Sequence, residues 1–174
     1  MTIDPLIEML CLSESLQENP MRTHALFFSC HPLLLSSLAQ AFESILSSLH
    51  FDFIYPSEAF SIPLATHLSF LYKVPLFLST SMDIFMHSGQ TALLLDASSS
   101  FSLRLQSAVD LFKKREIQVS DALILLEPTE EEKKISQNIP LTLHYLWDIK
   151  EVQTSLKTIM HQNSYSKIQS SDIS

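Results

Sequence analysis

Uninterrupted apolar runs alternate with helical segments through the middle of the chain, and this alternation limits the possible folds more than any other feature. The runs predict strands, and the segments between them predict helices at Ile62–Tyr72 and Ser102–Lys114. Strands without polar alternation are typical of parallel sheets that helices cover on both faces. We therefore expect an α/β fold with a central, mostly parallel sheet flanked by helices. The predicted strands are Phe51–Tyr55, Val74–Leu78, Thr91–Leu95 and Val119–Leu126.

Further elements are expected on both sides of this region. Thr129 and Glu132 have the spacing of a helix N-cap and capping box, and Asp148 is placed to cap a last helix. The whole forms one predicted domain over residues 1–161, and the tail at 162–174, rich in Ser and Gln, is expected to be disordered. The remaining predicted elements are helices at Pro5–Gln17, Pro32–Leu49 and Asp148–Met160 and strands at Ala25–Cys30 and Leu141–Tyr145.

Charge and residue usage exclude several classes of function. A net charge of −8 with scattered Lys and Arg makes nucleic acid an unexpected partner. The sequence has no uncharged apolar stretch of the roughly 18 residues that a membrane span needs, and acids near the N-terminus do not fit a signal peptide. We expect a cytoplasmic protein without a membrane partner. Seven scattered histidines and two cysteines, Cys11 and Cys30, predict no metal site and no disulfide framework.

Glycine is the most informative single count. Gly89 is the only glycine, whereas average usage would give roughly 12 in a chain of this length. Loops that wrap a phosphate depend on glycine, because other residues resist positive φ and carry a Cβ that blocks close approach. A glycine-cradled nucleotide site is therefore not expected.

The segment FDFIYPSEAFSIPLAT, which starts at Phe51, resembles the pattern FDxxxGxPYxxxPLAT of orotate phosphoribosyltransferases. SGQTALLLD then takes the place of that family's turn and signature strand, and VSDALILLE takes the place of its following strand. The likeness runs from Phe51 to about Leu156 and implies the type I phosphoribosyltransferase fold. The residues that match the first pattern are Phe51, Asp52, Pro63, Leu64, Ala65 and Thr66.

The family's signature pairs two acids, which reach ribose hydroxyls, with a Thr/Ser-Gly-Thr/Ser loop that holds a phosphate. In LLLDASSSFSL the second acid is kept as Asp96, but Leu95 replaces the first and Phe101 stands where the family has glycine. The resemblance implies a residual phosphate- and ribose-binding site made of Asp96, Ser99, Ser100 and Ser102. The alternative is that these residues only cap the following helix.

Two other parts of the family's site are altered as well. LSTSM at Leu78–Met82 lacks the arginine-lysine pair, and the interval to Gly89 is too short for the family's mobile loop. No lysine or arginine lies between Lys73 and Arg104, although a departing pyrophosphate needs cations. Glu58 would repel that pyrophosphate. We accordingly predict no catalytic residue.

The resulting hypothesis is a degenerate, non-catalytic orotate phosphoribosyltransferase-like protein whose scaffold serves oligomerisation or binding of an unidentified protein partner. The resemblance implies a homodimer and, on this hypothesis, no cofactor. The alternative is a divergent phosphoribosyltransferase of pyrimidine nucleotide metabolism. It would transfer ribose 5-phosphate from phosphoribosyl pyrophosphate, bound with Mg²⁺, to orotate or another base. A third possibility is a sensor that binds a different small ligand in the same crevice.

Overall fold

The computed structural model describes residues 32–78, 85–97, 101–148, 150 and 154 of the 174-residue chain. The helix predicted at Pro5–Gln17, the strand predicted at Ala25–Cys30 and the tail at 162–174 lie outside these residues. So does nearly all of the helix predicted at Asp148–Met160, although the Asp148 carboxylate accepts a hydrogen bond from the backbone N–H of Lys150.

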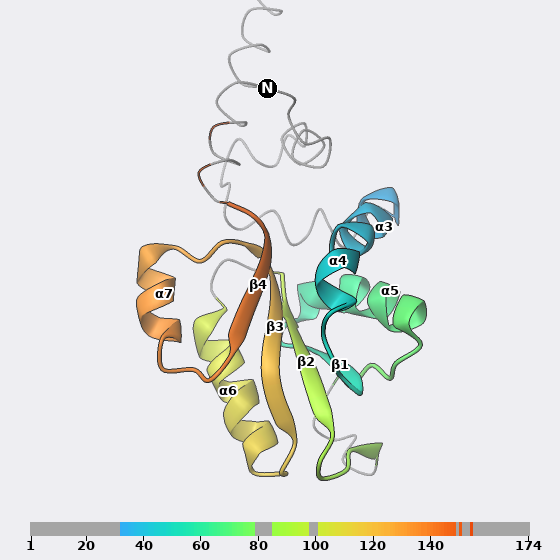
Figure 1. Cartoon of the computed structure of the whole chain (residues 1–174), viewed down its shortest axis with the longest axis vertical. Helices are drawn as coiled ribbons and strands as arrows, with labels where there is room; N and C mark the ends of the chain where they lie inside the picture. The colour runs from blue at the N-terminus through green and yellow to red at the C-terminus, as the bar shows by residue number, and fades with distance from the viewer. Residues whose placement is uncertain (1–31, 79–84, 98–100, 149, 151–153, 155–174) are drawn as a thin grey trace, which may run out of the picture.

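A four-stranded, fully parallel sheet forms the centre of the molecule, in the order β1-β2-β3-β4 (Figure 1). The register places Leu93 of β2 opposite Ile54 of β1, and Leu94 of β2 opposite Ala122 of β3. The predicted parallel sheet is thus confirmed. The strands are β1 (Phe53–Pro56), β2 (Thr91–Asp96), β3 (Gln118–Leu126) and β4 (Thr142–Trp147).

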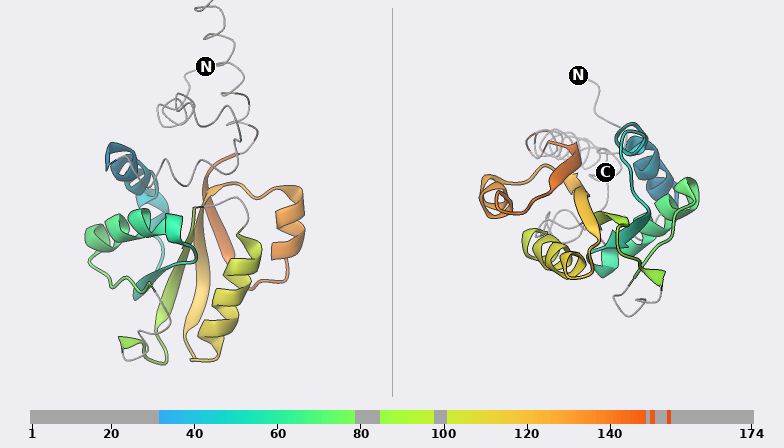
Figure 2. Two further views of the ribbon diagram at one scale, coloured as in Figure 1. Left: turned by 180° about the vertical axis from the view of Figure 1, so that it is seen from behind. Right: turned by 60° about the horizontal axis from the view of Figure 1, so that its bottom comes forward.

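Helices cover both faces of the sheet and make three layers (Figure 2). Side chains alternate between the faces, so that Leu93 and Leu95 pack beneath α3, α4 and α5 while Ala92 and Leu94 pack beneath α6. This double burial explains why β2 and the second half of β3 are continuously apolar. The helices are α3 (Pro32–Ala41), α4 (Glu43–Leu46), α5 (Ile62–Tyr72), α6 (Ser102–Lys113) and α7 (Glu130–Ser136), with a 3₁₀ turn, η2, at Ala59–Ser61.

Two predicted elements differ from the structure. The helix predicted at Pro32–Leu49 is divided at Phe42 into α3 and α4 and ends at Leu46. Val74–Leu78 forms a single parallel bridge, Leu76 opposite Ile54, instead of a full strand. The Pro75 carbonyl accepts from the Ile54 N–H at 3.0 Å, and the Phe77 N–H donates to the Ile54 carbonyl at 3.1 Å. Pro75 has no N–H of its own to donate, so the pairing does not extend into a longer ladder.

Left-handed backbone occurs at residues other than glycine. Lys73, the C-cap of α5, has φ 56° and ψ 38°, and Glu116, just after α6, has φ 57°. Gly89 has φ 86° in the turn before β2. Helices commonly end on a left-handed residue, and glycine adopts that conformation at the lowest cost. The shortage of glycine therefore leaves two helix ends with side chains in a strained backbone region.

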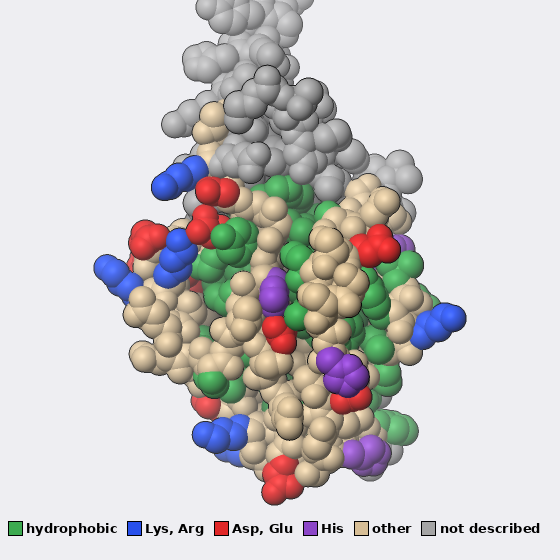
Figure 3. Space-filling view, viewed as in Figure 1, with side chains coloured by type: hydrophobic (Ala, Val, Ile, Leu, Met, Phe, Trp, Pro, Cys, Tyr) green, Lys and Arg blue, Asp and Glu red, His purple; other side chains and the backbone are tan. Residues whose placement is uncertain are grey.

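The described surface carries no concentration of positive charge on the face in Figure 3, where Lys and Arg side chains are scattered toward the edges. None of the helices in the described ranges has the length and apolar character needed to cross a bilayer.

The aromatic centre of the α6 side is expected to contribute strongly to stability. Phe112 is fully buried and meets Tyr55 and Phe53 edge-on, with ring centroids 5.0 and 5.7 Å away. Phe112→Ala should lower the free energy of unfolding by about 3–5 kcal/mol, measured by urea denaturation, because it empties a packed site. Leu103→Ala is the matched control on the same helix, since Leu103 is 76% exposed, and it should change stability by less than roughly 0.5 kcal/mol. Equal losses in the two variants would contradict this account of the core.

A substitution at the left-handed C-cap of α5 is expected to stabilise the protein. Lys73→Gly should raise the free energy of unfolding by about 0.5–1 kcal/mol, because relief of the Cβ clash outweighs the extra freedom of the unfolded chain. Lys73→Ala removes the same side-chain charge but keeps the Cβ, so it should give no such gain. Thermal and urea unfolding of both variants test this, and stabilisation by alanine as large as that by glycine would contradict it.

Candidate functional site

The candidate site lies where the strand order changes direction. From β1 the chain crosses to Leu76 on one side, and then returns to β2 on the other side of β1. The connections leaving the carboxyl ends of β1 and β2 therefore diverge, and in open α/β sheets ligands bind in the crevice at such a point. Ser57 and Glu58 follow β1 at this edge, where Asp96 ends β2 and Ala97 follows it.

Asp96 is completely buried and is held by residues of the protein itself. Arg104, in the first turn of α6, donates from Nε to Oδ2 at 2.8 Å and from Nη2 to Oδ1 at 3.1 Å. The Ser57 hydroxyl, from the segment after β1, also donates to Oδ2. Both carboxylate oxygens are thus engaged, and the ion pair joins the end of β2 to α6.

A second set of hydrogen bonds closes the edge beside Asp96. The Glu58 carboxylate accepts from the backbone N–H of Phe60 at 2.8 Å and from the Ser61 hydroxyl at 2.7 Å. The buried Ser61 oxygen in turn accepts from the backbone N–H of Ala97 at 2.8 Å. Glu58 therefore acts as the N-cap of η2, and Ser61 connects the residues that follow β1 with those that follow β2.

Ser102, the first residue of α6, donates its hydroxyl to the carboxylate of Glu132 on α7. The Thr129 hydroxyl accepts from the backbone N–H of Glu132 at 3.2 Å, which confirms the predicted N-cap of α7. The Glu132 side chain, however, contacts Ser102. An acid from α7 consequently lies beside the N-terminus of α6.

Arg104 is the cation around which these acids are arranged. Burial lowers the pKa of its guanidinium, but the hydrogen bond and charge of Asp96, together with the charges of Glu58 and Glu132, raise the pKa above its usual value. A cation in the first turn of a helix is disfavoured by the helix dipole, so its placement depends on these carboxylates.

Phe101, the residue before α6, is turned into the core and is only 2% exposed. It belongs to the cluster beneath α6, together with Leu94 and Leu105. The Phe101 carbonyl accepts from the backbone N–H of Leu105 at 2.9 Å, which continues the helical bonding to this residue. The ring therefore anchors the start of α6.

Of the four residues predicted from the signature, two are described at this edge. Asp96 and Ser102 both lie there, each hydrogen-bonded to another side chain of the protein, whereas Ser99 and Ser100 lie outside the described residues. Their partners Ser57, Arg104 and Glu132 were not predicted from the sequence. The unusual position of an arginine in the first turn of a helix was the one available signal for Arg104.

The edge offers no vacant polar group and no metal centre in the part of the chain that the structure describes. Every buried side-chain nitrogen or oxygen there has a hydrogen-bond partner. No three residues among the described His, Cys, Asp and Glu are grouped so that they could hold a metal ion.

Comparison with known proteins finds similar structures but no similar sequences among protein families or curated proteins. No protein-family model matches the sequence, and no curated protein matches it. The structure resembles Leishmania donovani UMP synthase, with a TM-score of 0.60 and 14% identity over 72% of this chain and 29% of that chain. This protein thus spans less than a third of that relative.

Two further relatives match over most of their own length. Orotate phosphoribosyltransferase from Francisella tularensis has a TM-score of 0.58 and 17% identity, over 77% of this chain and 75% of that chain. Adenine phosphoribosyltransferase from Saccharomyces cerevisiae has a TM-score of 0.55 and 14% identity, over 67% and 80%. With its parallel sheet and flanking helices, the chain has a type I phosphoribosyltransferase-like fold.

Proposed function

We propose that this protein is a non-catalytic relative of the phosphoribosyltransferases, which keeps the scaffold for binding another protein. The observation that carries the proposal is the complete burial of Asp96 between Arg104 and Ser57. The resemblance to orotate phosphoribosyltransferases implies that this carboxylate is the one signature acid left to bind ribose hydroxyls. Here it has a structural role instead.

Freeing Asp96 for a ligand would be costly. Its two oxygens would have to leave Arg104, and a buried charge that loses its partner is strongly destabilising. A ribose hydroxyl would offer only a hydrogen bond from an uncharged donor, of the kind that Ser57 already supplies, and not the charge of a guanidinium. The exchange therefore favours the closed arrangement.

The charges at the edge also oppose a phosphorylated sugar. Asp96 pairs with Arg104, and the negative charges of Glu58 and Glu132 also act on this single guanidinium. A pyrophosphate group would add further negative charge, and like charges brought together at short range in a partly buried site repel. With no lysine or arginine in the sequence between Lys73 and Arg104, this segment supplies no cation to offset that repulsion.

The position of Phe101 supports the same conclusion. Its buried ring belongs to the core beneath α6, so the backbone that enters the helix is tied to that core. A loop that closes around a phosphate needs backbone that approaches the ligand closely, for which glycine is suited and phenylalanine is not.

Calorimetric titration of phosphoribosyl pyrophosphate with Mg²⁺ is expected to show no binding heat, because the site has acids where the ligand needs cations. Orotate absorbance, and adenine consumption in a parallel assay, should stay constant in the presence of the protein. The Francisella tularensis orotate phosphoribosyltransferase serves as the positive control in the same buffer. Micromolar binding of the sugar diphosphate, or any protein-dependent loss of base, would replace this proposal with the divergent transferase.

The ion pair itself gives an independent test. Arg104→Met removes the guanidinium but keeps much of the apolar stem, and should lower the free energy of unfolding by roughly 3 kcal/mol. The low end of the range for a broken buried pair applies because Arg104 is itself 34% exposed. Lys113→Met, in the last turn of the same helix, should change stability by less than roughly 0.5 kcal/mol in urea denaturation. An Arg104 variant as stable as the Lys113 variant would show that Asp96 does not depend on this partner.

A further inference from the structure

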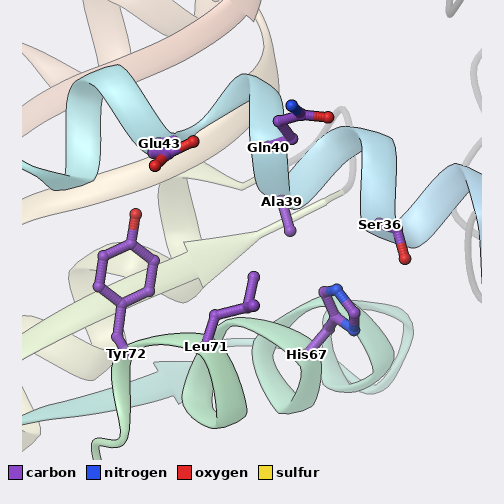
Figure 4. Close-up of a pocket in the computed structure, with 7 residues that line it drawn as sticks. All are labelled: Ser36, Ala39, Gln40, Glu43, His67, Leu71 and Tyr72. Carbon is purple, nitrogen blue, oxygen red and sulfur yellow. The ribbon is translucent and has the colours of Figure 1, made fainter.

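A groove with a volume of about 560 Å³ lies between α5 and the pair α3 and α4, apart from the edge that holds Asp96 (Figure 4). Ala39 and Leu71 lie in its middle, and the two ends are polar (Figure 4). Its volume is within the range of ligand-binding clefts, and its walls are two neighbouring helices. The polar ends are formed by Glu43 and Tyr72 on one side and by Ser36 and His67 on the other.

Two large apolar side chains of α5 are exposed, one in the groove and one next to it in the sequence. Leu71 is 56% exposed, and Phe70 beside it is 79% exposed. Phe70 also lies three residues after His67, so the two are neighbours on the helix surface. Large side chains left this open next to a groove are typical of a surface that another molecule covers.

The charge of the groove is one-sided. Figure 4 shows the Tyr72 hydroxyl directed toward Glu43. Burial and the negative charge of Glu43 raise the pKa of the Tyr72 hydroxyl. No lysine or arginine lines the groove, and within the described ranges the Glu43 carboxylate forms no salt bridge. The acidic end is thus complementary to a cation.

We infer that the groove docks an amphipathic helix of another protein, with apolar residues over Leu71 and Phe70 and a lysine or arginine against Glu43. Helices commonly bind by laying an apolar face into a groove between two other helices. A cation beside both a carboxylate and a tyrosine ring gains from an ion pair and from the ring. This inference names the kind of partner for the binding role proposed above and rests on it.

The charge of the chain argues against two other occupants. A second copy carries the same net charge of −8, so repulsion opposes self-association through an acidic surface. An acidic peptide would place its charges against Glu43, which has no neutralising neighbour among the groove residues. A basic helix is repelled neither by the net negative charge of the chain nor by Glu43.

Fluorescence anisotropy with the full chain tests the inference. The probe is a labelled amphipathic helical peptide built from leucine and lysine, and the comparison is the same peptide with glutamate in place of lysine. The lysine peptide should bind at micromolar concentration and the glutamate peptide at least about tenfold more weakly. Glu43→Gln should weaken the lysine peptide by about tenfold, because the ion pair is lost.

Two variants separate docking from general attraction between a cationic peptide and an acidic protein. Glu131→Gln removes an exposed charge on α7, away from the groove, and should leave binding unchanged. Leu71→Asp adds a negative charge, so general attraction predicts tighter binding, whereas docking predicts a loss of at least about tenfold. Leu71→Ser repeats the test without the added charge, and thermal unfolding confirms that each variant is folded.

Several results would overturn the inference. These are no binding of the lysine peptide, equal binding of the glutamate peptide, equal weakening by Glu131→Gln, or tighter binding to Leu71→Asp. Self-association of the protein that Leu71→Asp disperses would assign the groove to a second copy instead. The outcome is independent of the sugar diphosphate titration. Binding of that ligand contradicts the non-catalytic function alone, whereas failure of the peptide contradicts the groove alone.

Discussion

The buried pair of Asp96 and Arg104 is the interaction on which the carboxyl edge of the sheet depends. It holds the end of β2 against α6, and Ser57 adds the segment after β1 to the same carboxylate. Around it, Glu58 caps η2 and Glu132 accepts the hydroxyl of Ser102, and both contribute negative charge toward Arg104. An edge where open α/β sheets bind ligands is here occupied by the protein's own side chains. The groove along α5, where we infer that a partner docks, lies on a different part of the molecule.

Most of the described fold follows from local sequence patterns, because both faces of the sheet are buried. β2 and the second half of β3 are continuous apolar runs, α5 has the predicted bounds Ile62–Tyr72, and α6 ends within one residue of the prediction. The apolar pattern does not predict the structure where backbone hydrogen bonding limits strand pairing. Val74–Leu78 has the composition of a strand, but Pro75 removes a donor and the pairing stops at one bridge.

The position of the candidate site was predictable from the sequence, but the hydrogen-bond partners of its residues were not. Asp96 is the last residue of β2 and Ser102 is the first residue of α6, so local reasoning places them at the carboxyl edge. Their partners are distant in sequence, since Ser57 is 39 residues from Asp96 and Glu132 is 30 residues from Ser102. Whether a carboxylate faces a ligand or a guanidinium depends on such long-range contacts. A single sequence does not contain them.

Phe101 restricts which side chains this position of the scaffold accepts. A glycine at this position would loosen the entrance to α6, yet it would also leave an unfilled volume among Leu94, Leu105 and the other apolar residues beneath the helix. One substitution therefore cannot give a flexible turn without weakening the interior, and the neighbours would have to become larger to compensate. The residue at position 101 and the apolar side chains beneath α6 are thus coupled, and changes to them are not expected to be additive.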